Sequence, residues 1–262
     1  MKIYMAGVGG MLGEAFYEVF KEKGYDLKCS DIDVNESWLT YMDFRDYQSY
    51  RADVIKFNPN YIFHIGAYTN LEYCELNPLD TIKTNSLSVE HAVNLSNELN
   101  IPILYISTAG IFDGKKDLYD ESDSPNPLGV YARSKYMGER YVLENANKHY
   151  VCRAGWMMGG GPKKDKKYIS KIMNQLKSGK SILNVVDDRD GTPTYTIDFA
   201  TTCENLINTK HYGLYNMVCG GQTSRLEVTK EILSVIGMTN KIKINIFNSD
   251  FFKEKYFAAR QI

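Results

Sequence analysis

The sequence has few of the residues that build disulfide frameworks or metal sites. It contains five cysteines in 262 residues, with no Cys-x-x-Cys pair, and only four histidines, which lie far apart along the chain. Neither a zinc pattern nor a disulfide pattern is visible in this spacing. Thiols in a reducing cytosol are the simplest interpretation, so we expect a cytoplasmic protein without a bound metal.

The sequence also lacks long apolar runs and an excess of charge of either sign. No apolar run approaches the about 18 residues that would predict a membrane span, and a strand-like run begins directly after Met1, without a signal peptide. Lys and Arg number 31 against 32 Asp and Glu, a net charge of −1. This balance gives no indication of nucleic-acid or membrane binding, and we expect neither partner.

A glycine-rich turn near the N-terminus is the first feature that points to a ligand. A short apolar run leads into Gly7, Gly10 and Gly13, and from Met11 and Leu12 onward apolar residues recur at helical spacing. In such a strand–turn–helix unit the first glycine permits a tight turn, the second lets the backbone approach a pyrophosphate, and the third lets the helix pack closely on the strand. The alternative is a plain glycine turn without a ligand.

An acidic residue follows the second predicted strand. Asp31 ends the run of residues 25–30 and lies 18 positions after Gly13. A carboxylate there can accept hydrogen bonds from the ribose hydroxyls of adenosine and would repel a 2′-phosphate. We therefore expect NAD(H) or NADP(H) as cofactor, with NAD(H) favoured, although Asp31 could equally be a surface cap.

Strand-like and helix-like segments alternate along the chain. Further strands are predicted at residues 61–64, 102–107, 150–153, 181–186 and 214–219, with helices between most of them. This order predicts an α/β fold, a Rossmann-type doubly wound parallel sheet with a small C-terminal α/β substrate-binding part. We expect residues 1–153 to form the dinucleotide-binding domain, whose core continues to about residue 210, and residues 154–262 to form mainly the substrate-binding part, interleaved with that core.

A tyrosine and a lysine in the middle of the chain share one helical face. Tyr131 and Lys135 are four residues apart, which on a helix places them one turn from each other. Upstream, Ser107 and Thr108 end a predicted strand, and ligands bind at the carboxyl ends of parallel strands. The alternative is that Tyr131 and Lys135 merely face solvent.

These features together resemble the extended short-chain dehydrogenase/reductase family, and within it the dTDP-4-dehydrorhamnose reductases. The resemblance runs over most of the chain. The segments that carry it are Gly7 to Gly13, Gly66-Ala-Tyr-Thr69, Ser107-Thr108 with Ile111-Phe-Asp-Gly114, Tyr119-x-Glu121-x-Asp123 with Pro127 to Lys135, Gly138-Glu139, Arg153-x-x-Trp156 and Asp188-Arg-x-Gly191-x-Pro193-Thr194. The resemblance implies an NAD(P)H-dependent reductase of a nucleotide-linked 4-keto-6-deoxysugar, in the pathway to L-rhamnose.

The resemblance also implies the roles of three catalytic residues. Tyr131 would be the acid/base, and Thr108 would hydrogen-bond the carbonyl oxygen of the substrate. Lys135 would hold the nicotinamide ribose and lower the pKa of the Tyr131 phenol, since an ammonium one turn away stabilises a tyrosinate.

Further cofactor and substrate residues follow from the same resemblance. Asp43 and Phe44 would lie at the adenine, and Gly66, Ala67 and Tyr68 along the nicotinamide half. Asn85, on a helix predicted over residues 78–100, would support the active site as a buried hydrogen-bond partner of neighbouring backbone, unless it is simply exposed. The residues expected to contact the sugar nucleotide are Thr69, Ser107, Trp156, Arg189, Pro193 and Thr194.

The sequence departs from the family pattern in two places. Ala109-Gly110 follows the catalytic threonine where the family usually has Asp-Tyr, so we expect a different sugar preference. The final residues, Phe257-Ala-Ala-Arg260-Gln-Ile262, resemble a segment that relatives continue, and we expect a shortened tail. A basic loop with lysines at 163, 164, 166 and 167 is either solvated or a lid that carries charge for a substrate diphosphate.

Two other functions remain open at this point. A non-catalytic regulatory or binding subunit on the same fold is one, since some relatives with this fold regulate another enzyme. A nucleotide-sugar epimerase or dehydratase is the other, although dehydratases need an extra acid/base pair near Thr108. We expect a nucleotide-sugar substrate in either enzymatic case and leave a homodimer open.

Overall fold

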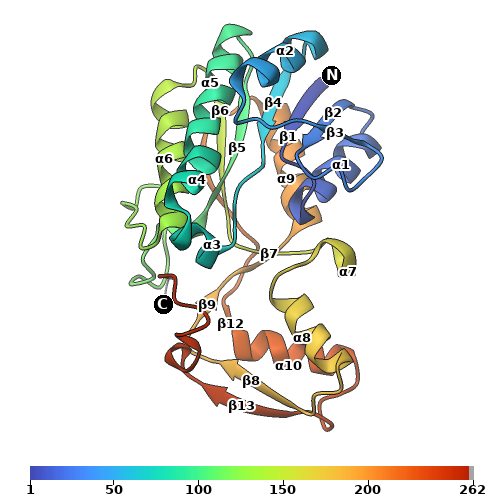
Figure 1. Ribbon diagram of the computed structural model, residues 1–262, viewed down its shortest axis with the longest axis vertical. Helices are drawn as coiled ribbons and strands as arrows, with labels where there is room; N and C mark the ends of the chain where they lie inside the picture. The colour runs from blue at the N-terminus through green and yellow to red at the C-terminus, as the bar shows by residue number, and fades with distance from the viewer. Residues whose placement is uncertain (260–262) are drawn as a thin grey trace.

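The computed structural model describes residues 1–259 and shows a large main body joined to a small lobe (Figure 1). Of the tail singled out above, the residues from Arg260 to Ile262 lie outside the described part. The main body is built on one central sheet, and the small lobe is a strand pair covered by two helices.

The central sheet has seven parallel strands in the order β11-β6-β5-β4-β1-β2-β3. This arrangement confirms the predicted doubly wound α/β fold. The chain runs outward from β1 on one side and then resumes with β4 on the other, so the strand order reverses beside β1, where open α/β sheets bind ligands. The strands are β1 (Lys2–Ala6), β2 (Asp26–Asp31), β3 (Leu39–Tyr41), β4 (Tyr61–His64), β5 (Ile103–Thr108), β6 (His149–Ala154) and β11 (Gly213–Met217).

Helices cover both faces of the sheet, so both faces are buried. Successive side chains of a strand therefore enter the two cores in turn. In β1, Ile3 and Met5 join the core under helices α1 and α9, whereas Tyr4 and Ala6 join the core under α2, α5 and α6. Figure 1 shows the two helical layers on opposite faces. The helices of the main body are α1 (Met11–Glu22), α2 (Tyr47–Phe57), α3 (Leu71–Leu76), α4 (Pro78–Ile82), α5 (Ser88–Glu98), α6 (Val130–Asn145) and α9 (Thr196–Thr209).

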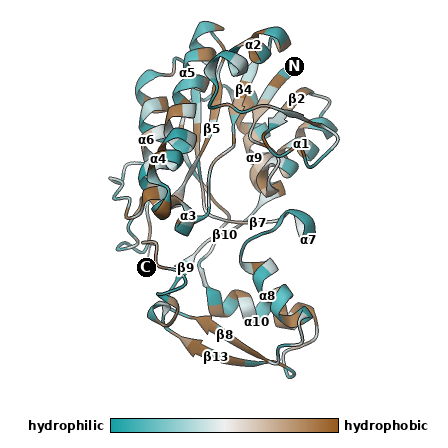
Figure 2. Cartoon of the chain, in the orientation of Figure 1, coloured by the Kyte–Doolittle hydropathy of each residue, from teal (hydrophilic) through white to brown (hydrophobic). Residues whose placement is uncertain are grey.

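The small lobe has a core of its own. The parallel pair β8 (Ile182–Val186) and β13 (Lys243–Phe247) packs against α8 (Tyr168–Lys177) and α10 (Arg225–Val235). Figure 2 shows hydrophobic residues along both strands. The buried residues of this core are Ile172, Leu183, Val185, Leu226, Leu233 and Ile242.

Two short strand pairs connect the main body to the small lobe. β7 (Trp156–Met158) pairs in parallel with β10 (Pro193–Tyr195), and β9 (Asp190–Gly191) pairs antiparallel with β12 (Thr223–Ser224). Figure 1 shows them at the crossing between the two parts. The chain passes through this junction in both directions, so β11 and α9 return to the main body after β8 has entered the small lobe.

The structure differs from the sequence-based expectation in two helical segments. The helix predicted over residues 78–100 is divided, because a π-helical turn, η1 (Lys83–Leu87), separates α4 from α5. Such wide turns occur often at functional sites, and this one carries Asn85. Helix α8 was not predicted, although Tyr168, Ile172 and Leu176 recur at helical spacing and lie in or against the core of the small lobe. Within residues 1–259 no helix has the length and apolar character to cross a bilayer.

Candidate active site

The threonine and tyrosine of the predicted site meet at the carboxyl end of the sheet. Thr108 is the last residue of β5, and Tyr131 lies in the first turn of α6. The Thr108 hydroxyl accepts a hydrogen bond from the Gly110 amide at 3.0 Å and lies close enough to the Tyr131 phenol to act on its pKa. A Cβ on Gly110 would lie 3.2 Å from Thr108 Oγ1 and 3.9 Å from Tyr131 Cε1. Glycine at 110 therefore leaves room beside both groups.

Lys135 lies one helical turn further and is buried. Lys135 is only 3% exposed, and its Nζ lies 4.2 Å from the centre of the Tyr105 ring. The Tyr105 phenol also donates to the Lys135 carbonyl oxygen at 3.0 Å. Burial lowers the pKa of Lys135 to about 7, with the charge of Glu139 acting in the opposite direction. At neutral pH this amine can therefore both hold and release a proton.

The pKa of Tyr131 does not shift in the expected direction. Burial raises it above its usual value, while the hydrogen bond with Thr108 acts to lower it. We expected Lys135 to lower it, but Lys135 is itself desolvated and has a pKa of about 7. In this structure the phenol is therefore neutral at pH 7, which is the form that donates a proton.

A buried ion pair lies directly behind the catalytic residues. Glu139, one turn beyond Lys135 on α6, is 0% exposed and pairs with Arg153 of β6 at 2.6 Å. The Ser107 hydroxyl of β5 donates to the same carboxylate at 2.5 Å. The pair thus joins the three elements that surround the site. Ser107 was expected to contact substrate; its hydroxyl is directed to Glu139, and the substrate contact stays a prediction.

The glycine loop has the form that a dinucleotide requires. Gly7 has φ +77°, and a Cβ there would lie 2.1 Å from the Gly66 Cα; at Gly13 a Cβ would lie 2.3 Å from Val8. These distances confirm the tight turn and the close helix–strand packing. A Cβ on Gly10 would meet nothing within 4 Å, so the loop has open space where a pyrophosphate would approach. The residues present therefore fit a dinucleotide.

Two residues that follow the glycine loop also pack around it. Met11 begins α1 and lies against Gly160, where a Cβ would be 2.8 Å from Met11 Cγ. Leu12 packs against the core beneath α1. Phe44 is buried against the point where Gly7 and Gly66 approach each other. Its ring therefore supports the glycine loop.

The two acids of the predicted adenosine site are both held by local bonds. Asp31 Oδ2 accepts a bond from the Gly9 amide at 2.8 Å, which places this carboxylate at the glycine loop, where a ribose would bind. Asp43 pairs with Arg45 at 2.7 Å, and these hydrogen bonds lower the pKa of its carboxyl. Both acids are therefore fixed in position by local hydrogen bonds.

Asn85 is buried and connects the nicotinamide side to the catalytic helix. Its Oδ1 accepts from the Tyr68 amide at 2.8 Å, and its Nδ2 donates to the Tyr68 carbonyl oxygen at 3.0 Å and to Ser134 Oγ at 3.1 Å. Ser134 Oγ in turn donates to the Tyr131 carbonyl oxygen at 2.8 Å. The buried interpretation of Asn85 is thus correct, and the exposed one is wrong. Its contacts are with protein backbone and Ser134.

A pocket opens beside this segment. Its volume is about 360 Å³, and it is lined by Ala67, Tyr68, Thr69, Asn70 and Tyr73. Three of these residues were predicted to bind cofactor or substrate. The Thr69 hydroxyl also accepts a bond from Lys167 Nζ at 2.9 Å, so one lysine of the basic loop reaches the rim of this pocket.

The remaining residues predicted for the substrate lie at the junction with the small lobe. Trp156 of β7 pairs with Pro193 of β10, and Thr194 is 2% exposed. Arg189 donates to Ser249 Oγ at 2.8 Å. The structure therefore brings Trp156, Pro193 and Thr194 together, while the contact of Arg189 is with the small lobe.

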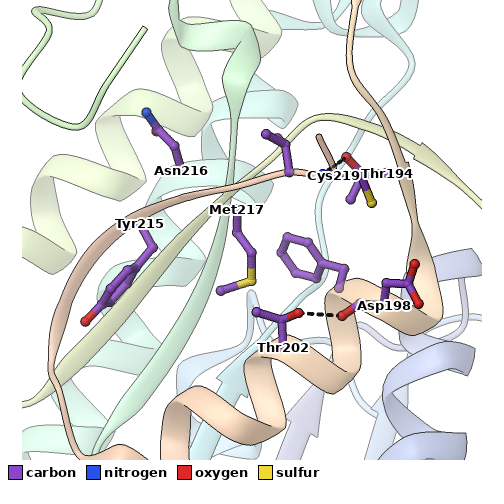
Figure 3. Close-up of a pocket in the computed structure, with 9 residues that line it drawn as sticks. Thr194, Asp198, Thr202, Tyr215, Asn216, Met217 and Cys219 are labelled. Carbon is purple, nitrogen blue, oxygen red and sulfur yellow. Dashed lines mark hydrogen bonds between the residues drawn. The ribbon is translucent and has the colours of Figure 1, made fainter. Parts of the chain in front are cut away.

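A second pocket lies between α9 and β11, on another side of Thr194. Figure 3 shows Thr194, Asp198 and Thr202 facing Tyr215 and Met217 across it. Its volume is about 270 Å³. None of the three predicted catalytic residues lines this pocket. We therefore place the reaction at Thr108 and Tyr131, because these residues carry the groups that the chemistry needs.

Four site residues were missed by the sequence analysis. Glu139 could have been found, because it continues the four-residue spacing from Tyr131 and Lys135 along the helix. Arg225, whose guanidinium lies 3.6 Å from the Trp156 ring centre, gave no local signal, and the lysines at 164 and 167 were noted only as members of the basic loop, without a role of their own. In the described residues, no group of three or more His, Cys, Asp or Glu side chains is placed to hold a metal ion.

Comparisons with known proteins agree with this geometry. The family described as RmlD substrate binding domain matches residues 1–254. A dTDP-4-dehydrorhamnose reductase of Aggregatibacter actinomycetemcomitans is 30% identical over 226 residues, 82% of this chain and 72% of that protein. The methionine adenosyltransferase 2 subunit beta of Danio rerio is 26% identical over 243 residues, 90% of this chain and 74% of that protein. The solved structure of dTDP-4-dehydrorhamnose reductase from Bacillus anthracis str. Ames in complex with NADP is 26% identical, with a TM-score of 0.87 over 96% of this chain and 86% of that one.

Proposed function

The chain belongs to the RmlD substrate binding domain family, and from that premise we propose that it is an NAD(P)H-dependent reductase of a nucleotide-linked 4-keto-6-deoxysugar. The observation that carries the proposal is that Thr108 and Tyr131 border one point at the end of β5, where a Cβ on Gly110 would lie 3.2 Å from Thr108 Oγ1 and 3.9 Å from Tyr131 Cε1. Lys135 lies one turn away. The names of the reductase relatives support the substrate class.

The chemistry follows from the groups present. The nicotinamide cofactor supplies a hydride when bound. Thr108 orients the carbonyl oxygen of the sugar, and the neutral Tyr131 phenol donates the proton that this oxygen needs on reduction. Lys135, with a pKa of about 7, would hold the nicotinamide ribose, and the buried Glu139 favours its charged form.

Substitution of Tyr131 tests this assignment. Tyr131→Phe removes only the phenolic oxygen, so we expect turnover of NADH with a dTDP-, GDP- or UDP-linked 4-keto-6-deoxysugar to fall by about 10²- to 10⁴-fold. Cofactor binding, measured by the fluorescence of NADH, should stay within about threefold of the unaltered chain. A folded, unaltered chain that oxidises NADH with no sugar of this panel would contradict the proposed function.

A second candidate function has an observation in its favour. The relative from Danio rerio is named as a subunit of another enzyme, and Ala109-Gly110 stands where the family usually has Asp-Tyr. A non-catalytic regulatory subunit would purify with a stoichiometric partner and show no turnover. The placement of Thr108 and Tyr131 beside each other at the end of β5 favours the reductase.

Three finer expectations belong to the same proposal. Asp31 at the glycine loop supports binding of NAD(H). Within the described residues all five cysteines are free thiols. This is consistent with the cytoplasmic location expected from the sequence. Size measurement in solution would test the homodimer that the sequence left open.

A further inference from the structure

A lysine from a distant part of the chain is buried against the glycine loop. Lys164 is the last residue of the short helix α7 (Gly161–Lys164), which follows β7 and leads to the small lobe (Figure 1). Its side chain is 5% exposed, and its Nζ donates to the Gly9 carbonyl oxygen at 3.0 Å. Lysine is rarely buried unless its charge has partners. The interpretation of the basic loop as wholly solvated is therefore wrong for Lys164.

Gly9 is also the residue that Asp31 contacts. Asp31 Oδ2 accepts a bond from the Gly9 amide at 2.8 Å, and Asn35 Nδ2 donates to the Gly9 carbonyl oxygen at 3.2 Å. Asn35 Oδ1 accepts a bond from Lys164. A carboxylate and an ammonium are thus bound to the two polar ends of one residue. Since the carboxylate after β2 is the group that contacts the adenosine ribose in this type of fold, Lys164 lies beside the position of the 2′-oxygen.

The other charges around this position are mainly acidic. Glu36 pairs with Lys164 at 3.1 Å and also with the exposed Lys163, and the Asp33 amide donates to Asp31 Oδ1 at 2.9 Å. Without Lys164, the buried side of this site would present only carboxylates and Asn35. A 2′-phosphate would then be repelled, so any cation that accepts it has to come from α7.

We propose that Lys164 determines cofactor specificity: its ammonium binds the 2′-phosphate and offsets the repulsion by Asp31, so that the chain takes NADP(H) as well as NAD(H). The inference rests on the proposed function, because it requires a dinucleotide on the glycine loop. Hydrogen bonds from an ammonium to a phosphate are charge-assisted and about twice as strong as neutral ones. The lysine is held in place beforehand by Gly9 and Asn35, which limits the entropy lost on binding. Its third N–H faces Glu36, so the phosphate would replace this carboxylate as the partner of the ammonium.

The test compares the affinities of the chain for NADPH and NADH without any sugar. Dissociation constants are measured by cofactor fluorescence at one fixed ionic strength, because the contact is electrostatic. Lys164→Met should weaken NADPH binding by about 10- to 100-fold and NADH binding by less than about threefold. Lys164→Arg should keep most of the NADPH affinity. Lys163→Met is the matched control, since it removes a neighbouring exposed ammonium, and it should change neither constant by more than about threefold.

Each other outcome has a definite meaning. Equal losses for NADPH and NADH would show that Lys164 only ties α7 to the glycine loop, and unchanged constants would show no contact; either result overturns the proposal. Failure of the unaltered chain to bind either dinucleotide would instead contradict the proposed function. If Lys164→Met does not fold, Lys164→Gln decides, because its amide can still donate to the Gly9 carbonyl oxygen: it should weaken NADPH relative to NADH by about tenfold, and an unchanged ratio would overturn the proposal.

Discussion

At the scale of single residues, the most consequential feature is the burial of charged and titratable groups beside the reaction centre. Lys135 Nζ lies 4.2 Å from the centre of the Tyr105 ring, and a cation over an aromatic face gains only part of what hydration would give it. Its position therefore serves the reaction at a cost to the fold.

Replacement of Lys135 by methionine should expose this cost. The pKa of Lys135 is about 7 in the folded chain and about 10.4 in an unfolded one. Between these values the unfolded state binds more protons, so this residue makes stability rise as the pH increases from about 7 to about 10. Lys135→Met should lose that rise, melt about 3 °C or more above the unaltered chain at pH 7, and have no reductase activity.

The measurement is thermal unfolding of both proteins at several pH values from 6 to about 10. Lys177→Met, at an exposed lysine of α8, is the control and should keep the pH dependence of the unaltered chain. A Lys135→Met variant with the same pH dependence as the unaltered chain would show that Lys135 is not the group responsible.

At the scale of elements, the buried pair of Glu139 and Arg153 fixes the catalytic helix to the sheet. The pair joins α6 to β6, and the Ser107 hydroxyl brings in β5. Removing one member of a buried pair leaves an uncompensated charge, which costs about 3–5 kcal/mol, whereas replacing both by apolar residues is often neutral. The pair should therefore matter more for how α6 is positioned than for net stability.

Substitutions of this pair should show that asymmetry. Glu139→Gln should lower the free energy of unfolding by about 3–5 kcal/mol, and the double variant Glu139→Leu with Arg153→Met should recover most of the loss. Urea denaturation measures both. The exposed pair Arg140 and Glu144 on the same helix is the control, and Glu144→Gln should cost less than about 0.5 kcal/mol. Equal losses for Glu139→Gln and the double variant would contradict this account.

The sequence was most informative about individual helices and strands. The short apolar run before Gly7 and the helical spacing after Met11 predicted a strand–turn–helix unit, because local patterns of apolar residues report what is buried. The spacing of Tyr131 and Lys135 predicted a shared face for the same reason. The π-helical turn that carries Asn85 was not predictable, since the residues around it keep an ordinary helical pattern while their hydrogen bonds to Tyr68 and Ser134 arise only on folding.

At the scale of the whole molecule, contacts between distant segments bind the small lobe to the main body. Arg225 at the start of α10 lies with its guanidinium 3.6 Å from the Trp156 ring centre and 4.6 Å from that of Tyr168, which anchors α10 and α8 at the junction. Lys164 and Lys167 then extend the connection to Gly9 and Thr69. No local pattern predicts such contacts, because they depend on how the chain returns through the junction.

This arrangement makes the segment of residues 159–167 a bridge across the two predicted halves of the cofactor site. Lys164 reaches the adenosine half at Gly9, and Lys167 reaches the nicotinamide half at Thr69. A ligand that binds only the folded form stabilises every part of the structure it contacts. A dinucleotide that lies along the glycine loop should therefore stabilise this segment together with the loop, although the two are far apart in sequence.

Hydrogen exchange of the backbone amides can measure this coupling. On addition of NADPH, exchange should slow by about tenfold or more in residues 159–167 and in the glycine loop. The strand pair β8 and β13 has its own core in the small lobe, and its exchange should stay nearly unchanged, which makes it an internal control. Slowing confined to the glycine loop would mean that α7 does not take part in binding. In Lys164→Met the slowing by NADPH in residues 159–167 should fall to the level that NADH gives, because only the phosphate of NADPH connects the ligand to the lysine.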